Sequence, residues 1–168
     1  MYVGMGGSYN MMTARFYDIF INLANAPGFV IDAGYRSGGP FRYGIRYWAS
    51  SHKGESPLFQ QNRFCFKGVE GYGRLLFARK RRLRPYFLLG YAILSLRSEN
   101  KEGYRGMGYS FALGVEYWLS GRWTVSTEFD VRYVDYNGIR IQSQERRTGM
   151  TNNGTMLSIK LLTLTRHF

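Results

Sequence analysis

The chain has 168 residues, of which 45% are hydrophobic and 17% aromatic, with 21 glycines, four prolines and a formal net charge of +12. This composition favours β structure over helix. No uninterrupted apolar run approaches the roughly 20 residues that a membrane helix needs, which excludes a helical membrane protein. A membrane barrel stays open because its strands need only about 9–11 residues each. The length predicts a single domain over residues 1–168.

Alternating polarity predicts eight strands, at residues 1–11, 27–37, 40–51, 63–77, 84–98, 105–119, 122–138 and 154–168. Three connections are tight, at 37–40, 78–84 and 120–122. The others are longer, at 12–26, 52–62, 99–104 and 139–153. Alternating short turns and long loops are typical of membrane barrels, with the turns at the periplasmic end. We therefore predict an all-β fold, an eight-stranded antiparallel up-and-down transmembrane β-barrel.

Within the predicted strands, the charged residues lie on one face of the alternation. Between residues 40 and 51, Phe41, Tyr43 and Ile45 share one parity, and Arg42 and Arg46 share the other. Small residues are frequent on the charged parity, which favours a crowded lumen over a solvated exterior. The predicted lumen network has five acidic and five basic members, which should pair because an unpaired buried charge is very costly. They are Asp32, Arg36, Arg42, Arg46, Glu70, Arg74, Glu116, Glu128, Asp130 and Arg132.

The predicted outward face carries large aromatic and aliphatic side chains. Tyr and Trp often fall near strand ends on this face, as in the two interfacial girdles of membrane barrels. These residues are Tyr9, Tyr35, Tyr43, Tyr47, Tyr117, Trp123 and Tyr133.

The segment from Thr13 to Pro27 shows a different periodicity. Phe16, Ile19, Phe20 and Leu23 recur at i, i+3, i+4 and i+7, the spacing of an apolar helical stripe. An apolar helix on an outer loop needs a lipid or protein partner, so these four residues are the candidate partner surface. The alternative is a long first hairpin whose strands project further.

The last predicted strand breaks the alternation. Leu157, Ile159 and Leu161 lie on one parity, whereas Leu162 and Leu164 lie on the other. A β-bulge near Leu161 would reconcile the two halves.

The surplus positive charge falls in turns and loops. Basic groups at an anionic membrane surface gain roughly 1 kcal/mol each, so these residues are candidate contacts for anionic lipid or lipopolysaccharide. The strongest candidates are Arg79, Lys80, Arg81, Arg82, Arg146 and Arg147, with Arg15, Lys53, Lys101, Arg105 and Arg140 also beside the outer loops. No helix-turn-helix, zinc finger or RNA-binding signature accompanies the charge, so we expect no nucleic-acid partner.

No catalytic or cofactor site is expected. One cysteine, Cys65, and two distant histidines, His52 and His167, make no metal cluster, and Cys65 is expected to be a small apolar filler. Ser50, His52 and a loop acid such as Glu55 could in principle form a hydrolytic site, but the spacing is a weak signal. The first ten residues lack the features of a secretory signal, so the chain is expected to be a mature form.

Several short segments resemble the small outer-membrane β-barrel proteins of the OmpA/OmpX type. The matching segments are 2–7, 84–86 with Gly90, 114–117 before a Ser-Gly-Arg turn, Trp123 onward, and the terminal Phe168. The resemblance implies integral localisation in a bacterial outer membrane. It also implies that the outer-membrane assembly machinery reads Phe168 during biogenesis.

These features favour a non-enzymatic barrel with a plugged lumen that acts as a structural or interaction protein through its outer loops. Its partners would be outer-membrane lipids, lipopolysaccharide, a host surface or another membrane protein, with this chain as a subunit of a larger complex in the last case. The alternatives are a narrow small-solute channel, a lipid A-modifying hydrolase or acyltransferase, and a soluble lipocalin-like carrier of opposite polarity.

Overall fold

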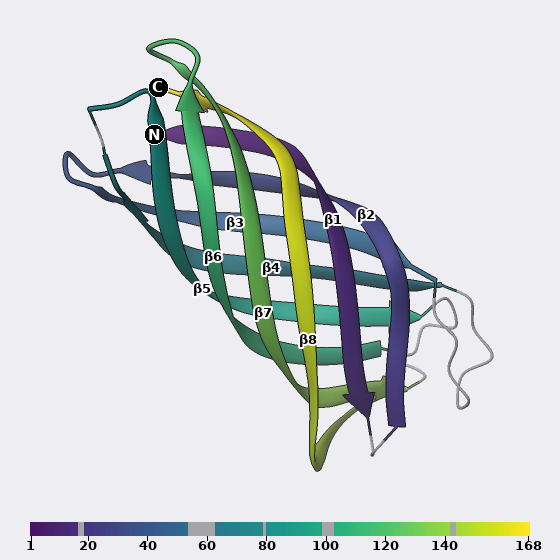
Figure 1. The fold of residues 1–168 in the computed structure, drawn as a ribbon. Coiled ribbons are helices and arrows are strands. Elements are labelled where there is room, and N and C mark those ends of the chain that lie inside the picture. Colours follow the sequence, from purple (N-terminus) through teal and green to yellow (C-terminus); the bar gives the residue numbers. More distant parts are fainter. Residues whose placement is uncertain (17–18, 54–62, 79, 99–102, 142–143) are drawn as a thin grey trace.

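The computed structural model describes the backbone of residues 1–16, 19–53, 63–78, 80–98, 103–141 and 144–168. Within the strands, the side chains of residues 14–16, 19–22, 98, 138–141 and 144–152 lie outside the description. Eight antiparallel strands, ordered β1 to β8, close into a barrel in which β8 pairs with β1 (Figure 1). The strands are β1 Tyr2–Phe16, β2 Ile19–Arg36, β3 Phe41–His52, β4 Phe64–Leu76, β5 Leu83–Ser98, β6 Gly103–Trp118, β7 Trp123–Ile141 and β8 Gln144–His167.

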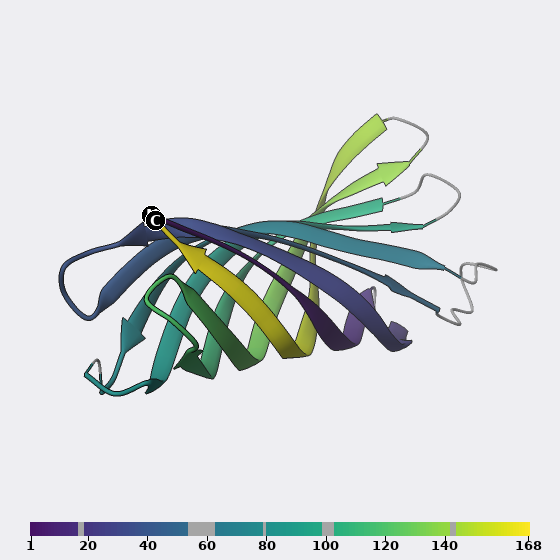
Figure 2. The same cartoon turned by 90° about the horizontal axis from the view of Figure 1, so that it is seen from above.

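The two ends of the barrel differ. Both termini lie at the end that carries the three tight turns, which we call the turn end (Figure 1). There the Phe168 amide donates to the Met1 carbonyl at 3.0 Å. The opposite end, which we call the loop end, carries the remaining connections, and the β7–β8 hairpin projects there (Figure 2). At the loop end, β1–β2 and β7–β8 are long hairpins, whereas 53–63 and 99–102 connect β3–β4 and β5–β6. In outer-membrane barrels, the tight turns lie in the periplasm and the longer extensions lie outside.

The outside of the barrel is apolar, as the alternation predicts. Large hydrophobic side chains are exposed on every strand. Ile45, Ile93 and Tyr109, for example, are each 63% exposed. Of the predicted girdle residues, Tyr9, Tyr35, Tyr43, Tyr117, Trp123 and Tyr133 are exposed and Tyr47 is partly exposed. A soluble carrier would bury this face, so the lipocalin-like alternative is wrong. The described residues include no helix long and apolar enough to span a membrane.

Two predicted loops are largely strand. The segment predicted as a loop at 12–26 forms the paired ends of β1 and β2, where Arg15 pairs with Phe20 and Phe16 pairs with Ile19. The helical alternative for the partner surface is therefore wrong, because extending the ladder pairs these backbone groups across the hairpin, whereas an isolated helix of this length is marginal. Leu23 is also not a surface residue, being only 5% exposed inside the barrel. Likewise, β7 and β8 pair through most of 139–153.

The predicted bulge in β8 is confirmed. Neighbouring β1 pairs Gly7 with Leu162 but Ser8 with Lys160, so Leu161 is the extra residue. The shift leaves Leu161 and Leu162 both facing outward, at 64% and 60% exposure, and Lys160, which precedes the shift and shares its parity with Ser158, lies in the lumen at 2%. A bulge thus lets one strand keep leucines on the lipid face on both sides of a parity change.

Glycines on the inward face make room for large side chains of the neighbouring strand. A Cβ atom on Gly68 would lie 1.4 Å from two ring atoms of Trp48, whereas a Cβ on Gly71, three residues along β4, would meet nothing within 4 Å. The lumen at this level has no space for a further methyl group.

Gly68→Ala is expected to destabilise the barrel by about 1–3 kcal/mol, because Trp48 or the backbone must move. Gly71→Ala is the matched control and should leave stability unchanged or slightly raised. Urea unfolding in lipid vesicles measures both variants. Equal midpoints for Gly68→Ala and the unmodified protein would contradict the packing described for Trp48.

Candidate functional site

The interior of the barrel holds most of the ionisable side chains predicted to face it. Nine of the ten predicted network residues are no more than 5% exposed, and alternate residues of β2, β3, β4, β6 and β7 carry them inward. They are Asp32, Arg42, Arg46, Glu70, Arg74, Glu116, Glu128, Asp130 and Arg132.

The layer nearest the turn end is built on one forked ion pair. The two terminal nitrogens of Arg42 contact the two carboxylate oxygens of Glu116, with Nη2 to Oε1 at 2.9 Å. The Trp118 indole donates to the same carboxylate at 2.7 Å. A bidentate arginine–carboxylate contact fixes both side chains in orientation as well as in position.

The middle layer shares its charges among several partners. Arg46 donates to both oxygens of Glu128, at 3.0 and 3.1 Å, and lies 3.5 Å from Asp32. Arg74 reaches the same Asp32 oxygen at 3.4 Å and Glu128 at 3.9 Å. Removal of one member therefore takes a counter-charge from two or more buried partners and leaves the lumen with an unbalanced charge.

The third layer lies closer to the loop end. Arg132 donates to Glu70 at 3.0 Å and also pairs with Asp130 on its own strand. Lys160 links this layer to the middle one, because its ammonium contacts both Asp130, at 3.3 Å, and Glu128. The Ser110 hydroxyl donates to the other Glu70 oxygen.

The network differs from the predicted one at two positions. Arg36 is only half-buried, at the turn-end mouth, where its guanidinium lies 5.2 Å from the Trp118 ring. Lys160 is the member that the sequence analysis missed, although it lies on the parity opposite to Leu157 and Ile159 and alternation therefore directs it inward. With Lys160 included, five carboxylates face five cations among the described buried residues of the lumen.

Tyrosines fill the space between the ion pairs. The Tyr72 ring lies 4.8 Å from the Arg46 guanidinium, and the Tyr86 ring lies 4.3 Å from that of Arg74. The Tyr86 hydroxyl donates to Glu128 at 2.9 Å, and the hydroxyls of Tyr2 and Tyr72 share a 2.7 Å bond. These contacts combine cation–π attraction with hydrogen bonding of otherwise buried hydroxyls.

Between the charged layers and the loop end, the lumen is lined mainly by apolar side chains. The Arg132 guanidinium lies 4.7 Å from the Trp48 ring, and Trp48 packs against Phe66 with ring centroids 5.7 Å apart. This layer was not predicted, although its members share the parity of the charged face. They are Met12, Leu23, Val30, Trp48, Phe64, Phe66, Leu94, Leu96, Tyr104, Val134, Tyr136 and Met156, with Ala92 at its edge.

Ser50 and His52 do form a pair beside this apolar layer. The Ser50 hydroxyl lies 2.8 Å from His52 Nε2, and His52 Nδ1 lies 2.9 Å from the Ala24 carbonyl. This arrangement resembles a serine–histidine dyad, but Ser50 is 6% exposed and His52 is fully buried. Glu55, the predicted third member, lies outside the described residues.

The remaining candidates lie on the surface or outside the description. Lys80, Arg81 and Arg82 are exposed in the β4–β5 turn, at the turn end. Arg79 lies outside the described residues, and Arg146 and Arg147 belong to β8, but their side chains are not described. Phe168 is 73% exposed. Cys65 is exposed on the outer wall, so the expectation of a buried filler is wrong.

Arg46→Ala or Glu128→Ala is expected to destabilise the barrel by about 3–5 kcal/mol, because each leaves an unbalanced charge in the buried network. Lys80→Ala, which removes an exposed cation from a turn, should change the stability by less than about 0.5 kcal/mol. Urea unfolding midpoints in vesicles report all three. Midpoints for Arg46→Ala and Glu128→Ala that match the Lys80→Ala control would show that the lumen charges do not stabilise one another.

Solved structures with the same fold span nearly the whole chain. Neisserial surface protein A is 13% identical, with a TM-score of 0.68 over 99% of this chain and 97% of that one. OprG from Pseudomonas aeruginosa is 10% identical, with a TM-score of 0.64 over 99% and 95%. Ail of Yersinia pestis, in complex with the heparin analogue sucrose octasulfate, is 11% identical, with a TM-score of 0.53 over 99% and 98%.

A comparison with curated proteins gave no match. Residues 1–160 match the family described as outer membrane protein beta-barrel domain. This match covers nearly all of the chain and agrees with the closed eight-stranded barrel and its apolar exterior. The chain therefore belongs to the outer membrane protein beta-barrel family and is an integral protein of the outer membrane.

Proposed function

We propose that this protein is a non-conducting, non-enzymatic barrel that works as a structural and interaction protein through its loop end and outer wall. The observation that carries the proposal is the filling of the lumen at two successive levels. A neutral set of ion pairs occupies the half toward the turn end, and the apolar layer around Trp48 and Phe66 occupies the half toward the loop end. Binding at outer surfaces is then the function best supported.

The narrow-channel alternative needs a water-filled path through both levels. The side chains of Arg46, Glu70 and Arg132 are no more than 2% exposed. Trp48 and Phe66, which lie nearer the loop end, are 4% and 1% exposed. An eight-stranded barrel is only wide enough for its interior to be filled by side chains. These facts support a closed lumen.

The enzyme alternative would rest on Ser50 and His52. A hydrolase needs its nucleophile open to substrate and a base poised beside it. The hydrogen bond between Ser50 and His52 places a base beside the hydroxyl, but burial of both side chains closes the hydroxyl to substrate. Ser50 and His52 face the lumen, whereas a lipid substrate at the outer wall would contact the opposite face of β3.

The loop end offers the larger interaction surface. The strands β7 and β8 have 19 and 24 residues, well beyond the roughly 9–11 that cross a bilayer, so their hairpin extends past the membrane. Candidate partners are lipopolysaccharide, a host surface or another membrane protein. The Ail structure with sucrose octasulfate supports the idea that a barrel of this fold can present a surface to a polyanion.

In planar lipid bilayers, the purified barrel is expected to give no stable unitary conductance, because the lumen ion pairs and the apolar layer leave no water-filled path. Trp48→Ala with Phe66→Ala is the matched comparison, since it removes the largest apolar side chains and should raise the leak current. A stable conductance of the unmodified protein whose ion selectivity changes in Arg46→Gln would contradict the proposal and favour the channel.

A further inference from the structure

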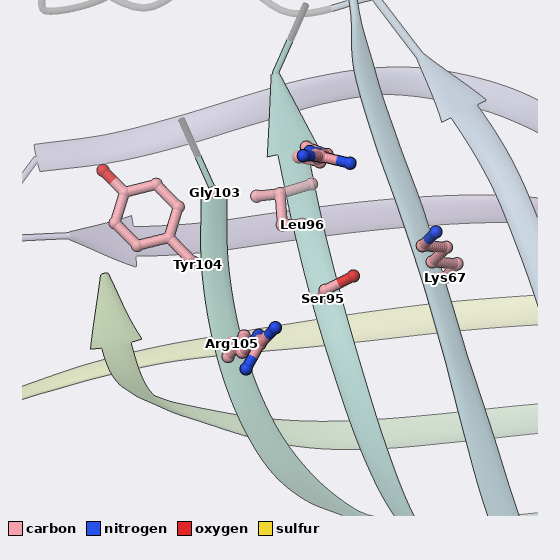
Figure 3. Close-up of a pocket in the computed structure, with 7 residues that line it drawn as sticks. Lys67, Ser95, Leu96, Gly103, Tyr104 and Arg105 are labelled. Carbon is pink, nitrogen blue, oxygen red and sulfur yellow. The ribbon is translucent and has the colours of Figure 1, made fainter. Parts of the chain in front are cut away.

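A row of polar and basic side chains crosses three strands on the outer wall of the barrel. In the register, Lys67 of β4 lies opposite Ser95 of β5, and Ser95 lies opposite Arg105 of β6. One step closer to the loop end, Arg97 lies opposite Cys65 on one side and Gly103 on the other. Figure 3 shows Lys67, Ser95 and Arg105 on their three neighbouring strands.

A hollow of about 140 Å³ is lined by Lys67, Ser95, Arg97 and Arg105, together with Gly103. Ser95, with its small side chain, and Gly103, with none, alternate with the long basic residues, which leaves space between the cations. Adjacent strands lie about 4.8 Å apart, so three long cationic side chains can converge on one tetrahedral anion. The Ser95 hydroxyl supplies a further hydrogen-bond donor in the same row.

The row marks an abrupt change of polarity along the wall. The next row toward the turn end is Val69, Ile93 and Met107, with exposures of 50%, 63% and 42%. Apolar residues continue from there toward the turn end on β5 and β6. The basic row therefore lies at the edge of the apolar band that is nearer the loop end, at the level where lipid headgroups meet the acyl chains.

A second hollow joins the first and points to the kind of ligand. It shares Lys67, Ser95 and Arg105 with the first hollow and continues over the apolar side chains of Val69 and Ile93, with a volume of about 310 Å³. A free anion would use only the basic part. A molecule with an anionic head and an apolar chain would fill both.

Two of the cations at this site, Lys67 and Arg97, are exposed on the outer wall. Five of the six acidic residues with described side chains lie in the lumen network, and the sixth is Asp135 on β7. Among the described residues, no carboxylate forms an ion pair with Lys67 or Arg97. Two exposed cations with no carboxylate partner in the described part of the chain favour a phosphate group, which arginine binds with its planar fork and lysine as a point charge.

We infer that Lys67, Arg97, Arg105 and Ser95 form a binding site for the phosphate group of an outer-leaflet lipid, with an acyl chain lying over Val69 and Ile93. The loop end faces the exterior in this family of folds, so the lipid is of the phosphorylated glycolipid class that forms lipopolysaccharide. This inference deepens the proposed interaction role and rests on it.

Native mass spectrometry of the detergent-solubilised barrel with added lipid A tests the site. The expected result is a retained lipid A molecule, with affinity falling about five-fold for each cation removed in Lys67→Gln, Arg97→Gln and Arg105→Gln, and on the order of a hundred-fold in the triple variant. The matched control is Lys80→Gln with Arg81→Gln and Arg82→Gln, three exposed cations of the turn end, which should retain lipid A unchanged. The slower gel mobility of boiled samples verifies that every variant is folded.

Two competitors identify the source of the phosphate. Dephosphorylated lipid A should bind at least ten-fold more weakly, and inorganic phosphate should not displace lipid A at millimolar concentration. Equal loss of affinity in the two triple variants would overturn the site, as would displacement by inorganic phosphate alone or equal binding of the dephosphorylated lipid. None of these results bears on conductance, so failure of this inference is distinguishable from failure of the proposed closed lumen.

Discussion

The barrel depends on electrical neutrality inside a closed wall. Five carboxylates and five cations are buried together in the described lumen, and most of them contact more than one partner. Each charge alone would cost several kcal/mol to remove from water, so the set is stable only when complete. This constraint explains the tyrosines around the guanidinium groups and the presence of Lys160 in the lumen, where its ammonium contacts Glu128 and Asp130. It also leaves the outer surfaces as the places where the protein can meet other molecules.

Much of this arrangement follows from alternation in the sequence. The parity of β3, with Arg42 and Arg46 on one face and Tyr43 and Ile45 on the other, is enough to assign inside and outside, because lipid and lumen impose opposite polarity on alternate residues. The parity break after Leu161 predicts the bulge for the same reason. The sequence does not show which charges pair, since partners such as Arg46 and Glu128 are 82 residues apart. Only closure of the barrel brings them into contact.

Three features could not be decided from the sequence, for identifiable physical reasons. The spacing of Phe16, Ile19, Phe20 and Leu23 fits a helix as well as a strand hairpin, and only backbone pairing between β1 and β2 decides for the hairpin. The apolar layer around Trp48 shares its parity with the charges, so polarity alone could not reveal a lumen that changes character along its axis. The site at Lys67, Ser95 and Arg105 draws one residue from each of three strands, and strand register alone makes them neighbours.

A double-mutant cycle on Arg42 and Glu116 tests the central claim most directly, because their forked contact is the simplest pair in the network. Both residues are replaced by Met, singly and together, and the free energy of unfolding in vesicles is measured. The account predicts that each single change is strongly destabilising and that the double change costs less than their sum by at least about 1 kcal/mol. Additive effects, with each single change within about 0.5 kcal/mol of the unmodified protein, would contradict a lumen held together by paired charges.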